Sequence, residues 1–185
     1  MARLDDLEIR SPRLRLVPSA LEYAPAIFAS FTAEVTKYMF PAPAREIAET
    51  EAFLRGARAA TEAGTDLQVV ILNGETEEFL GHGGLHHIDA RTPELGIWIK
   101  TAAHGNGYGR EAVTSLALWA RANLNFDYLI YPVDRRNIAS RRIPESLGGV
   151  IEAEYAMTNA SGNELEILEY RIYPSTLAKR TGERA

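Results

Sequence analysis

The chain has 185 residues, of which 46% are hydrophobic and 24% are charged, a balance typical of one soluble globular domain with a sizeable core. Its net charge of −5 argues against sequence-independent binding to nucleic acid, and no apolar run approaches the length of a membrane-spanning helix. Cysteine is absent, which excludes disulfides, thiolate metal sites and cysteine nucleophiles.

The first third of the chain predicts a strand that is followed by two helices. Leucines alternate with arginines over residues 13–16, as is typical of an edge strand. Ser19 and Glu22 have the spacing of a capping box, so a helix is expected to begin there. A second helix is predicted over about residues 45–63, and Gly64 is its expected C-terminal stop.

Three strands are predicted next, over residues 67–72, 78–88 and 94–100. An Asn-Gly pair at positions 73–74 separates the first two, and this dipeptide is a strong signal for a β-hairpin. The third strand ends in a glycine-rich turn over residues 104–109. The three strands are therefore expected to form an antiparallel meander.

The second half of the chain alternates between helices and strands. The helix after the glycine-rich turn has one apolar face, which is formed by Val113, Leu116, Ala117 and Ala120. The elements expected after it are a strand over 128–133, a short helix after Asn137, and strands over 151–158 and 164–173 that are joined by a turn at 159–162.

This order predicts a mixed α+β sheet with helices on both sides. The strand–helix–strand unit in the second half implies one locally parallel pair with a right-handed crossover. We expect a single domain over residues 1–185, with its core over about 8–174 and a frayed polar tail over 175–185.

The glycine-rich turn carries the clearest chemical signal. Gly105, Gly107 and Gly109 connect a strand to the start of a helix. Glycine permits positive φ and leaves room for a bulky anion, and the free amides of a helix's first turn favour negative charge. The turn therefore predicts a phosphate or pyrophosphate site. The alternative interpretation is a glycine-rich connector that binds no ligand. The turn is not a nucleotide P-loop, because no Gly-Lys-Ser/Thr follows, and its glycine spacing does not fit a Rossmann turn.

The same segment resembles the cofactor motif of the GNAT superfamily of N-acetyltransferases, Gln/Arg-x-x-Gly-x-Gly/Ala. His104 stands at the Gln/Arg position, which removes a positive charge or amide donor, and Gly107 and Gly109 stand at the glycine positions. Four further segments resemble, in order, parts of the RimJ/RimL-type branch: residues 11–16, 35–39, 94–99, and 137–140 with 147–149.

The resemblance implies the GNAT fold, in which about seven strands form a mixed, mostly antiparallel sheet that is splayed between strands four and five. It also implies acetyl-CoA as the co-substrate, without a metal, and pantetheine that lies in the gap against main-chain groups. The cofactor-binding residues that it implies are Ile97, Trp98, Ile99, His104, Gly105, Asn106, Gly107, Tyr108, Gly109, Arg110, Asn137 and Ser140.

Amine acetylation needs a base for the amine and an acid for the leaving thiolate. The resemblance places the base at Glu94, whose pKa burial would raise, and the alternative is an ordinary strand-end glutamate. Many GNAT enzymes carry a tyrosine where this chain has Pro144, so the implied acid is Ser140. A helix cap is the alternative role for Ser140, and Pro144 would then lie at the edge of the first turn. Residues 158–159 occupy the register of a second glutamate found in RimL-like enzymes, and neither is glutamate.

Three histidines cluster in the strand predicted over residues 78–88. His82 and His86 are expected to share one face, and His87 to point away. No carboxylate or thiol completes a set of metal ligands in this pattern, so we expect no metal site.

The resemblance favours direct acetyl transfer to a primary amine, most closely a peptide α-amine such as the N-terminus of a ribosomal protein. Two alternatives stay open: a small-molecule acetyltransferase for a polyamine, antibiotic or amino acid, and a non-catalytic acyl-CoA-binding module. The acceptor groove is expected to involve the first two helices, the loop over residues 38–43 and the final hairpin. We expect a cytoplasmic monomer or homodimer, because the N-terminus lacks an export signal, with no nucleic-acid or membrane partner.

Overall fold

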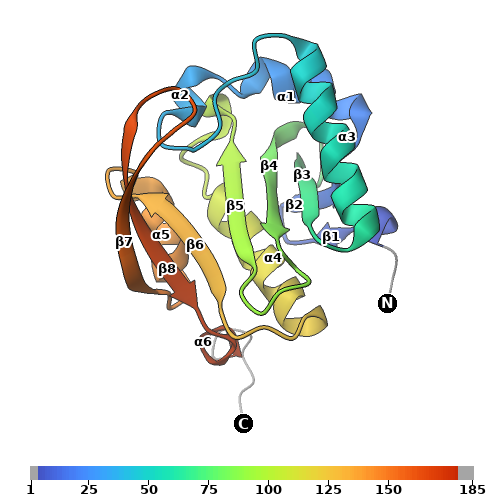
Figure 1. Cartoon of the computed structure of the whole chain (residues 1–185). Helices are drawn as coiled ribbons and strands as arrows, with labels where there is room; N and C mark the ends of the chain where they lie inside the picture. Colours follow the sequence, from blue (N-terminus) through green and yellow to red (C-terminus); the bar gives the residue numbers. More distant parts are fainter. Residues whose placement is uncertain (1–3, 179–185) are drawn as a thin grey trace.

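The computed structural model describes residues 4–178. Within them the chain forms one mixed sheet in the strand order β1-β2-β3-β4-β5-β6-β8-β7 (Figure 1). Neighbouring strands are antiparallel except for β5 and β6, which are parallel. The strands are β1 (Ile9–Arg10), β2 (Leu14–Pro18), β3 (Leu67–Asn73), β4 (Phe79–His86), β5 (Glu94–Ile99), β6 (Leu129–Asp134), β7 (Val150–Thr158) and β8 (Glu164–Ile172).

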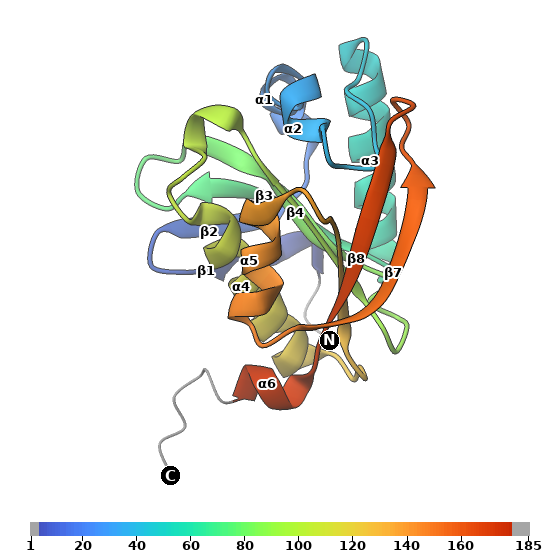
Figure 2. The same cartoon turned by 90° about the vertical axis from the view of Figure 1, so that its left-hand side faces the viewer.

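Helices cover both faces of the sheet (Figure 2). On one face α4 and α5 pack on the larger core, and on the other α1 and α3 pack on a smaller cluster with β3. The helices are α1 (Ala24–Ser30), α2 (Ala33–Thr36), α3 (Ile47–Ala63), α4 (Tyr108–Asn123), α5 (Ile138–Ser146) and α6 (Pro174–Ala178). The predicted fold is confirmed, and the described sheet gains one strand over the expected seven because the two-residue β1 joins its edge.

The predicted apolar face of α4 is fully buried: Val113, Leu116, Ala117 and Ala120 show no exposed surface. Apolar residues at this spacing form one stripe of a helix, and burying that stripe supplies most of the helix's stability. The face of α4 that packs on the sheet therefore follows directly from the sequence, and so does the position of the glycine-rich turn at the helix start.

β5 and β6 separate soon after they meet. Their register holds a single pair, Glu94 opposite Ile130, and Figure 1 shows the two strands diverging toward their carboxyl ends. The predicted splay between the fourth and fifth strands, counted without β1, is therefore confirmed.

Beyond its one pair with β6, β5 turns main-chain groups toward this gap, and the Ile99 carbonyl there accepts from the His104 side chain. Lys100 N donates to Leu80 O, so the ladder to β4 uses the even-numbered residues of β5. Hydrogen bonding alternates along an antiparallel pair, and the N–H and C=O groups of Ile97 and Ile99 therefore face the gap.

Ser19 does not cap a helix, so the predicted capping box is wrong. The chain enters a 3-10 turn, Leu21–Tyr23, before α1, and Ala20 holds the cap position. Ser19 is buried, and its Oγ lies 2.7 Å from Nε2 of His82. The hydroxyl satisfies a ring nitrogen that would otherwise be buried without a partner.

Buried His82 should make the fold sensitive to mild acid. Burial lowers the pKa of His82 from 6.5 to about 3, and the charge of His86 acts in the same direction. The unfolded chain takes up this proton near pH 6.5 and the folded chain only near pH 3, so stability falls as the pH drops through that window. Between pH 7 and pH 5 this histidine should cost the fold roughly 2 kcal/mol.

Urea unfolding at both pH values measures this effect. His82→Gln should remove most of the pH-dependent loss, whereas His87→Gln, at an exposed position of the same segment, should leave it unchanged. Equal losses in the His82 variant and the parent protein would contradict the assignment.

The C-terminal tail was predicted to fray from residue 175, which is wrong for its first residues. Pro174–Ala178 form α6, and Leu177 is fully buried against the larger core. The remainder of the predicted tail, 179–185, lies outside the described residues. Among the helices of residues 4–178, none is both long and apolar enough to cross a membrane.

Candidate active site

The glycine-rich turn lies between β5 and α4. Gly105 (φ +79°) and Gly107 (φ +75°) adopt the left-handed conformation that favours glycine, and α4 begins at Tyr108. The amides of Tyr108, Gly109 and Arg110 donate no hydrogen bond to another described residue. Three free donors therefore meet at the positive end of the helix dipole, which is the arrangement that binds phosphate.

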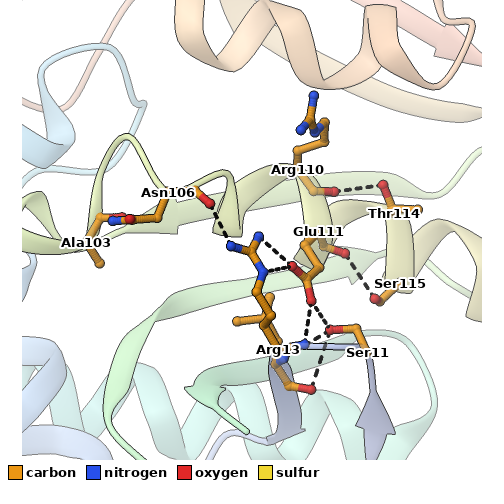
Figure 3. Close-up of polar contacts among 9 residues, drawn as sticks. Ser11, Arg13, Ala103, Asn106, Arg110, Glu111, Thr114 and Ser115 are labelled. Carbon is orange, nitrogen blue, oxygen red and sulfur yellow. Dashed lines mark hydrogen bonds and ion pairs between the residues drawn. The ribbon is translucent and has the colours of Figure 1, made fainter.

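Arg13 and Glu111 hold the turn in place from the side of β2 (Figure 3). The Arg13 guanidinium donates to Asn106 O (Nη1, 3.0 Å) and to Glu111 Oε2 (Nε, 2.7 Å), and Ser11 Oγ donates to Glu111 Oε1 at 2.7 Å. Burial opposes the ionisation of Glu111, but these hydrogen bonds outweigh it and lower the pKa of the carboxyl. The charged pair fixes the turn before any anion arrives.

A cavity of about 440 Å³, which we call the cofactor cavity, lies between this turn, α5 and the gap beside β5. Arg142 also lines it and was not predicted; together with Arg110 it adds positive charge beside the free amides. These donors and cations fit a diphosphate. The predicted residues that line the cavity are Ile97, Trp98, Ile99, His104, Gly105, Gly107, Tyr108, Gly109, Arg110, Asn137 and Ser140.

Two of the predicted residues, His104 and Asn106, use their side chains for hydrogen bonds within the turn and the adjoining end of β5. Nε2 of His104 lies 2.7 Å from Ile99 O, and because a carbonyl only accepts, the ring nitrogen donates. The Asn106 side chain donates to Ala103 O and His104 O, and Asn106 does not line the cavity. His104 thus fixes the end of β5, a role that its residue type alone did not reveal.

A second cavity of about 480 Å³, the reaction cavity, opens where β5 and β6 separate. It shares Met39, Ile97, Asn137 and Ser140 with the cofactor cavity, so the two spaces meet. Both predicted catalytic residues, Glu94 and Ser140, line it. The sequence placed them 46 positions apart, and the divergence of the two strands brings them to one space.

Glu94 lies at the first position of β5, partly buried. Burial raises the pKa of its carboxyl, the neighbouring His86 and His87 partly offset this shift, and the charge of Glu169 adds to it. The raised pKa makes this carboxyl a stronger base than an exposed glutamate.

Ser140 is not the cap of α5, which corrects one of its two expected roles. Asn137 caps the helix by accepting Ser140 N at 3.2 Å, and Pro144 lies buried inside α5, beyond the first turn. The Ser140 Oγ instead lies 2.8 Å from the hydroxyl of Tyr131 on β6. Burial raises the pKa of Tyr131, although the bond to Ser140 acts against that shift. Tyr131 therefore stays protonated at neutral pH, and its hydroxyl can donate a hydrogen bond to Ser140.

Sequence reasoning missed Tyr131 and also His86. His86 pairs directly across the sheet with Glu94 and lines the reaction cavity, and its Nδ1 lies 3.4 Å from Asp66 Oδ2. The pairing register would have revealed it, because residues opposite each other in an antiparallel pair share a face. Within residues 4–178, no group of three or more metal-binding side chains comes together.

The loop after α2 is tied to the final hairpin over the reaction cavity. Asn159 Nδ2 donates to Met39 O at 3.1 Å, and Ala160 N donates to Phe40 O at 2.9 Å. Oδ1 of Asn159 also accepts from the amides of Ser161 and Asn163, so this buried residue shapes the turn. Asn159, one of the two positions that could match the second glutamate of RimL-like enzymes, thus has a structural role.

Several solved structures share this fold. A proposed acetyltransferase from T. thermophilus is 24% identical, with a TM-score of 0.76, and the match covers 96% of this chain and 97% of that one. RimL, a ribosomal L7/L12 alpha-N-protein acetyltransferase solved with coenzyme A, is 16% identical (TM-score 0.79; coverage 90% and 98%). The spermidine N-acetyltransferase from Vibrio cholerae, solved with CoA and spermine, is 17% identical (TM-score 0.78; coverage 91% and 99%).

No curated protein matches the sequence. The model of the acetyltransferase (GNAT) domain family does match, over residues 13–150, which is most of the chain. The match includes Glu94, Ser140 and the glycine-rich turn. Enzymes of this family transfer an acyl group from acetyl-CoA, and the free amides, the cations and the open strand edge described above suit that co-substrate. The chain belongs to the GNAT family of acetyltransferases.

Proposed function

We propose that this enzyme acetylates the α-amine of a peptide, as the RimJ/RimL-type resemblance implies, by direct transfer from acetyl-CoA in a ternary complex. One observation carries the proposal: Glu94 and Ser140 line a single cavity that opens into the cofactor cavity. RimL, which shares the fold, acts on a protein α-amine, and this supports the choice of acceptor.

The roles follow from the geometry. Glu94 takes the proton from the amine, directly or through one water, and the neutral nitrogen forms the new C–N bond. The Ile97 N–H, which faces the gap, is positioned to stabilise the charge that develops on the carbonyl oxygen. As the C–S bond breaks, Ser140 donates its hydroxyl proton to the sulfur, and the hydroxyl of Tyr131 stabilises Ser140 by hydrogen bonding. A proton from solvent then restores Ser140, and Glu94 releases to solvent the proton that it took from the amine.

The proposal is tested by incubating the enzyme with acetyl-CoA and short peptides that have free or blocked N-termini. Free thiol should appear only with free N-termini, and mass spectrometry should place the acetyl group on the α-nitrogen. Turnover with spermidine but not with peptides would contradict the peptide acceptor. Binding of acetyl-CoA without turnover on any amine would indicate a non-catalytic module instead.

Ser140→Ala should lower kcat by about 10- to 100-fold and leave the KM for acetyl-CoA within about twofold, because the hydroxyl acts only as the thiolate leaves. Tyr131→Phe, which keeps the ring and removes the hydrogen bond to Ser140, should lower kcat less. Steady-state kinetics at saturating acetyl-CoA measures both values. A Ser140→Ala enzyme with parental kcat would show that solvent protonates the thiolate.

A further inference from the structure

A third cavity of about 370 Å³ lies on the opposite face of the sheet from α4, beneath α1 and α3. We call this cavity the apolar pocket. The proposed cofactor contacts and proton transfers do not explain why the protein has it. Most of its lining is hydrophobic or glycine, and the residues that matter below are Phe31, Phe53, Gln68, His82, Gly96 and Trp98.

Two glycines form the floor of the apolar pocket. Gly84 on β4 pairs with Gly96 on β5, and Gln68 on β3 lies beside them in the same row. Pairs directly opposite each other share a face, so His82 with Trp98 and His86 with Glu94 form the flanking rows on that face. The missing side chains at the two glycines leave a hollow between these rows.

The walls of the hollow are aromatic. The Phe31 and Trp98 rings lie 5.0 Å apart, and Phe53 packs edge-on against His82 at 5.5 Å. Phe53 is nevertheless 46% exposed, so part of this large apolar side chain has nothing packed on it. An apolar group in the hollow would cover surface that the protein leaves to water.

The pocket offers no free charge to a cationic ligand. His82 is neutral, since burial lowers its pKa to about 3. Glu49 is the only carboxylate among the described lining residues, and Arg45 occupies it with three hydrogen bonds of 2.9–3.2 Å. A second ammonium group, as in a polyamine, would find no unpaired carboxylate here.

The apolar pocket is continuous with the reaction cavity. Both are lined by Met39, Pro41, His86, Gly96 and Ile97. An amine whose nitrogen lies beside Glu94 therefore has the hollow over Gly96 as the nearest space for the group on its adjacent carbon.

We infer that the acceptor amine carries a bulky apolar or aromatic substituent, such as the side chain of an N-terminal leucine or phenylalanine, which fills the pocket over Gly84 and Gly96. This inference rests on the proposed function. It adds the side chain that the enzyme selects, whereas the proposed function names only the nucleophile.

The test is a panel of peptides that differ only in their first residue: Leu, Phe, Ala, Ser or Lys. Leucinamide, free leucine and spermidine are added, so that a peptide is distinguished from an amino acid or a polyamine as the source of the amine. kcat/KM for the Leu and Phe peptides should exceed that for the Ala and Ser peptides at least tenfold. Equal or better turnover of the Ala peptide would overturn the inference and leave the proposed function intact. A lack of turnover with every amine would overturn both.

A variant pair links the preference to the pocket. A Cβ at Gly96 would meet only the His86 ring, at 3.5 Å from Nε2, so the backbone accepts a side chain here, and we expect that of Gly96→Val to occupy the hollow. This variant should lower kcat/KM for the Leu peptide at least tenfold more than kcat/KM for the Ala peptide. Phe53→Ala, at a half-exposed position that does not endanger the core, should also weaken the preference for Leu.

Phe28→Ala is the matched control, because Phe28 is an exposed phenylalanine on α1 that does not line the pocket. Its peptide preference should equal that of the parent enzyme. A Leu preference that is unchanged in both Gly96→Val and Phe53→Ala would overturn the pocket as its source.

Discussion

Replacing Glu94 by glutamine should lower kcat by about 10²- to 10⁴-fold at neutral pH, the range expected when a general base is removed. The amide has the same shape as the carboxyl, so the reaction cavity and the cofactor cavity should keep their form. The KM for acetyl-CoA should therefore change less than threefold. Stopped assays of free thiol with a saturating acceptor peptide measure both constants.

The pH dependence provides a second and sharper readout. Glu94 acts as a base only when ionised, so kcat should fall as the pH drops through its pKa, and burial moves that pKa above the ordinary value of 4.5. Glu169→Gln is the matched control. It removes a like charge that raises the pKa of Glu94, so it should shift the acidic limb to lower pH with little loss of kcat. Full activity of Glu94→Gln at neutral pH would exclude Glu94 as the base.

Local patterns predicted the elements of this fold because each one depends on nearby residues. The apolar stripe of α4 and the stop of α3 at Gly64 (φ +73°) follow from helical spacing and from glycine's tolerance of positive φ. The hairpin at Asn73-Gly74 also forms. Its positive φ lies at Glu77 and not at Gly74, whose N–H donates to Arg13 O just before β2. The Asn-Gly dipeptide therefore predicted that a hairpin forms, but not the conformation of its loop, which includes a tertiary contact to Arg13.

The two errors about helix caps share one physical cause, which is competition for short polar side chains. Ser19 and Ser140 both have the residue type of a helix cap, and both instead bond to a distant buried ring, His82 and Tyr131 respectively. A buried hydrogen-bonding group without a partner costs about 1–3 kcal/mol, at least as much as a cap contributes. Local spacing cannot reveal such a partner, because only the pairing of strands brings it near.

The floor of the apolar pocket depends on register in the same way. Gly84 and Gly96 are ordinary glycines in the sequence, and they form a hollow only because β4 and β5 place them opposite each other. Glu94 and Ser140 could be proposed from a resemblance. Their meeting in one cavity depends on the divergence of β5 from β6, which no local pattern encodes.

Gly107→Val should weaken the binding of acetyl-CoA by about 10- to 100-fold or more. Gly107 has φ +75°, where a β-branched residue is strained, so the peptide planes on either side of it should rotate to relieve the strain. Rotation withdraws the amides at the start of α4 from the diphosphate. Each hydrogen bond to a charged group contributes about 1.5–3 kcal/mol, so the loss of one accounts for the lower figure and the loss of two for the upper. Isothermal titration with coenzyme A measures the change.

Gly64→Val is the control for backbone strain. Gly64 has φ +73° and, like Gly107, no heavy atom within 3.4 Å of the point where a Cβ would lie, but it ends α3 away from the cofactor cavity. Both variants should lose about 1–2 kcal/mol of stability, and only Gly107→Val should lose affinity. Gly109→Ala should bind normally, because its Cβ would make ordinary contacts with Ile143 (3.5 Å) and Ile99 (3.6 Å). Normal affinity in Gly107→Val would show that side chains such as Arg110 and Arg142, and not the amides of the turn, hold the diphosphate.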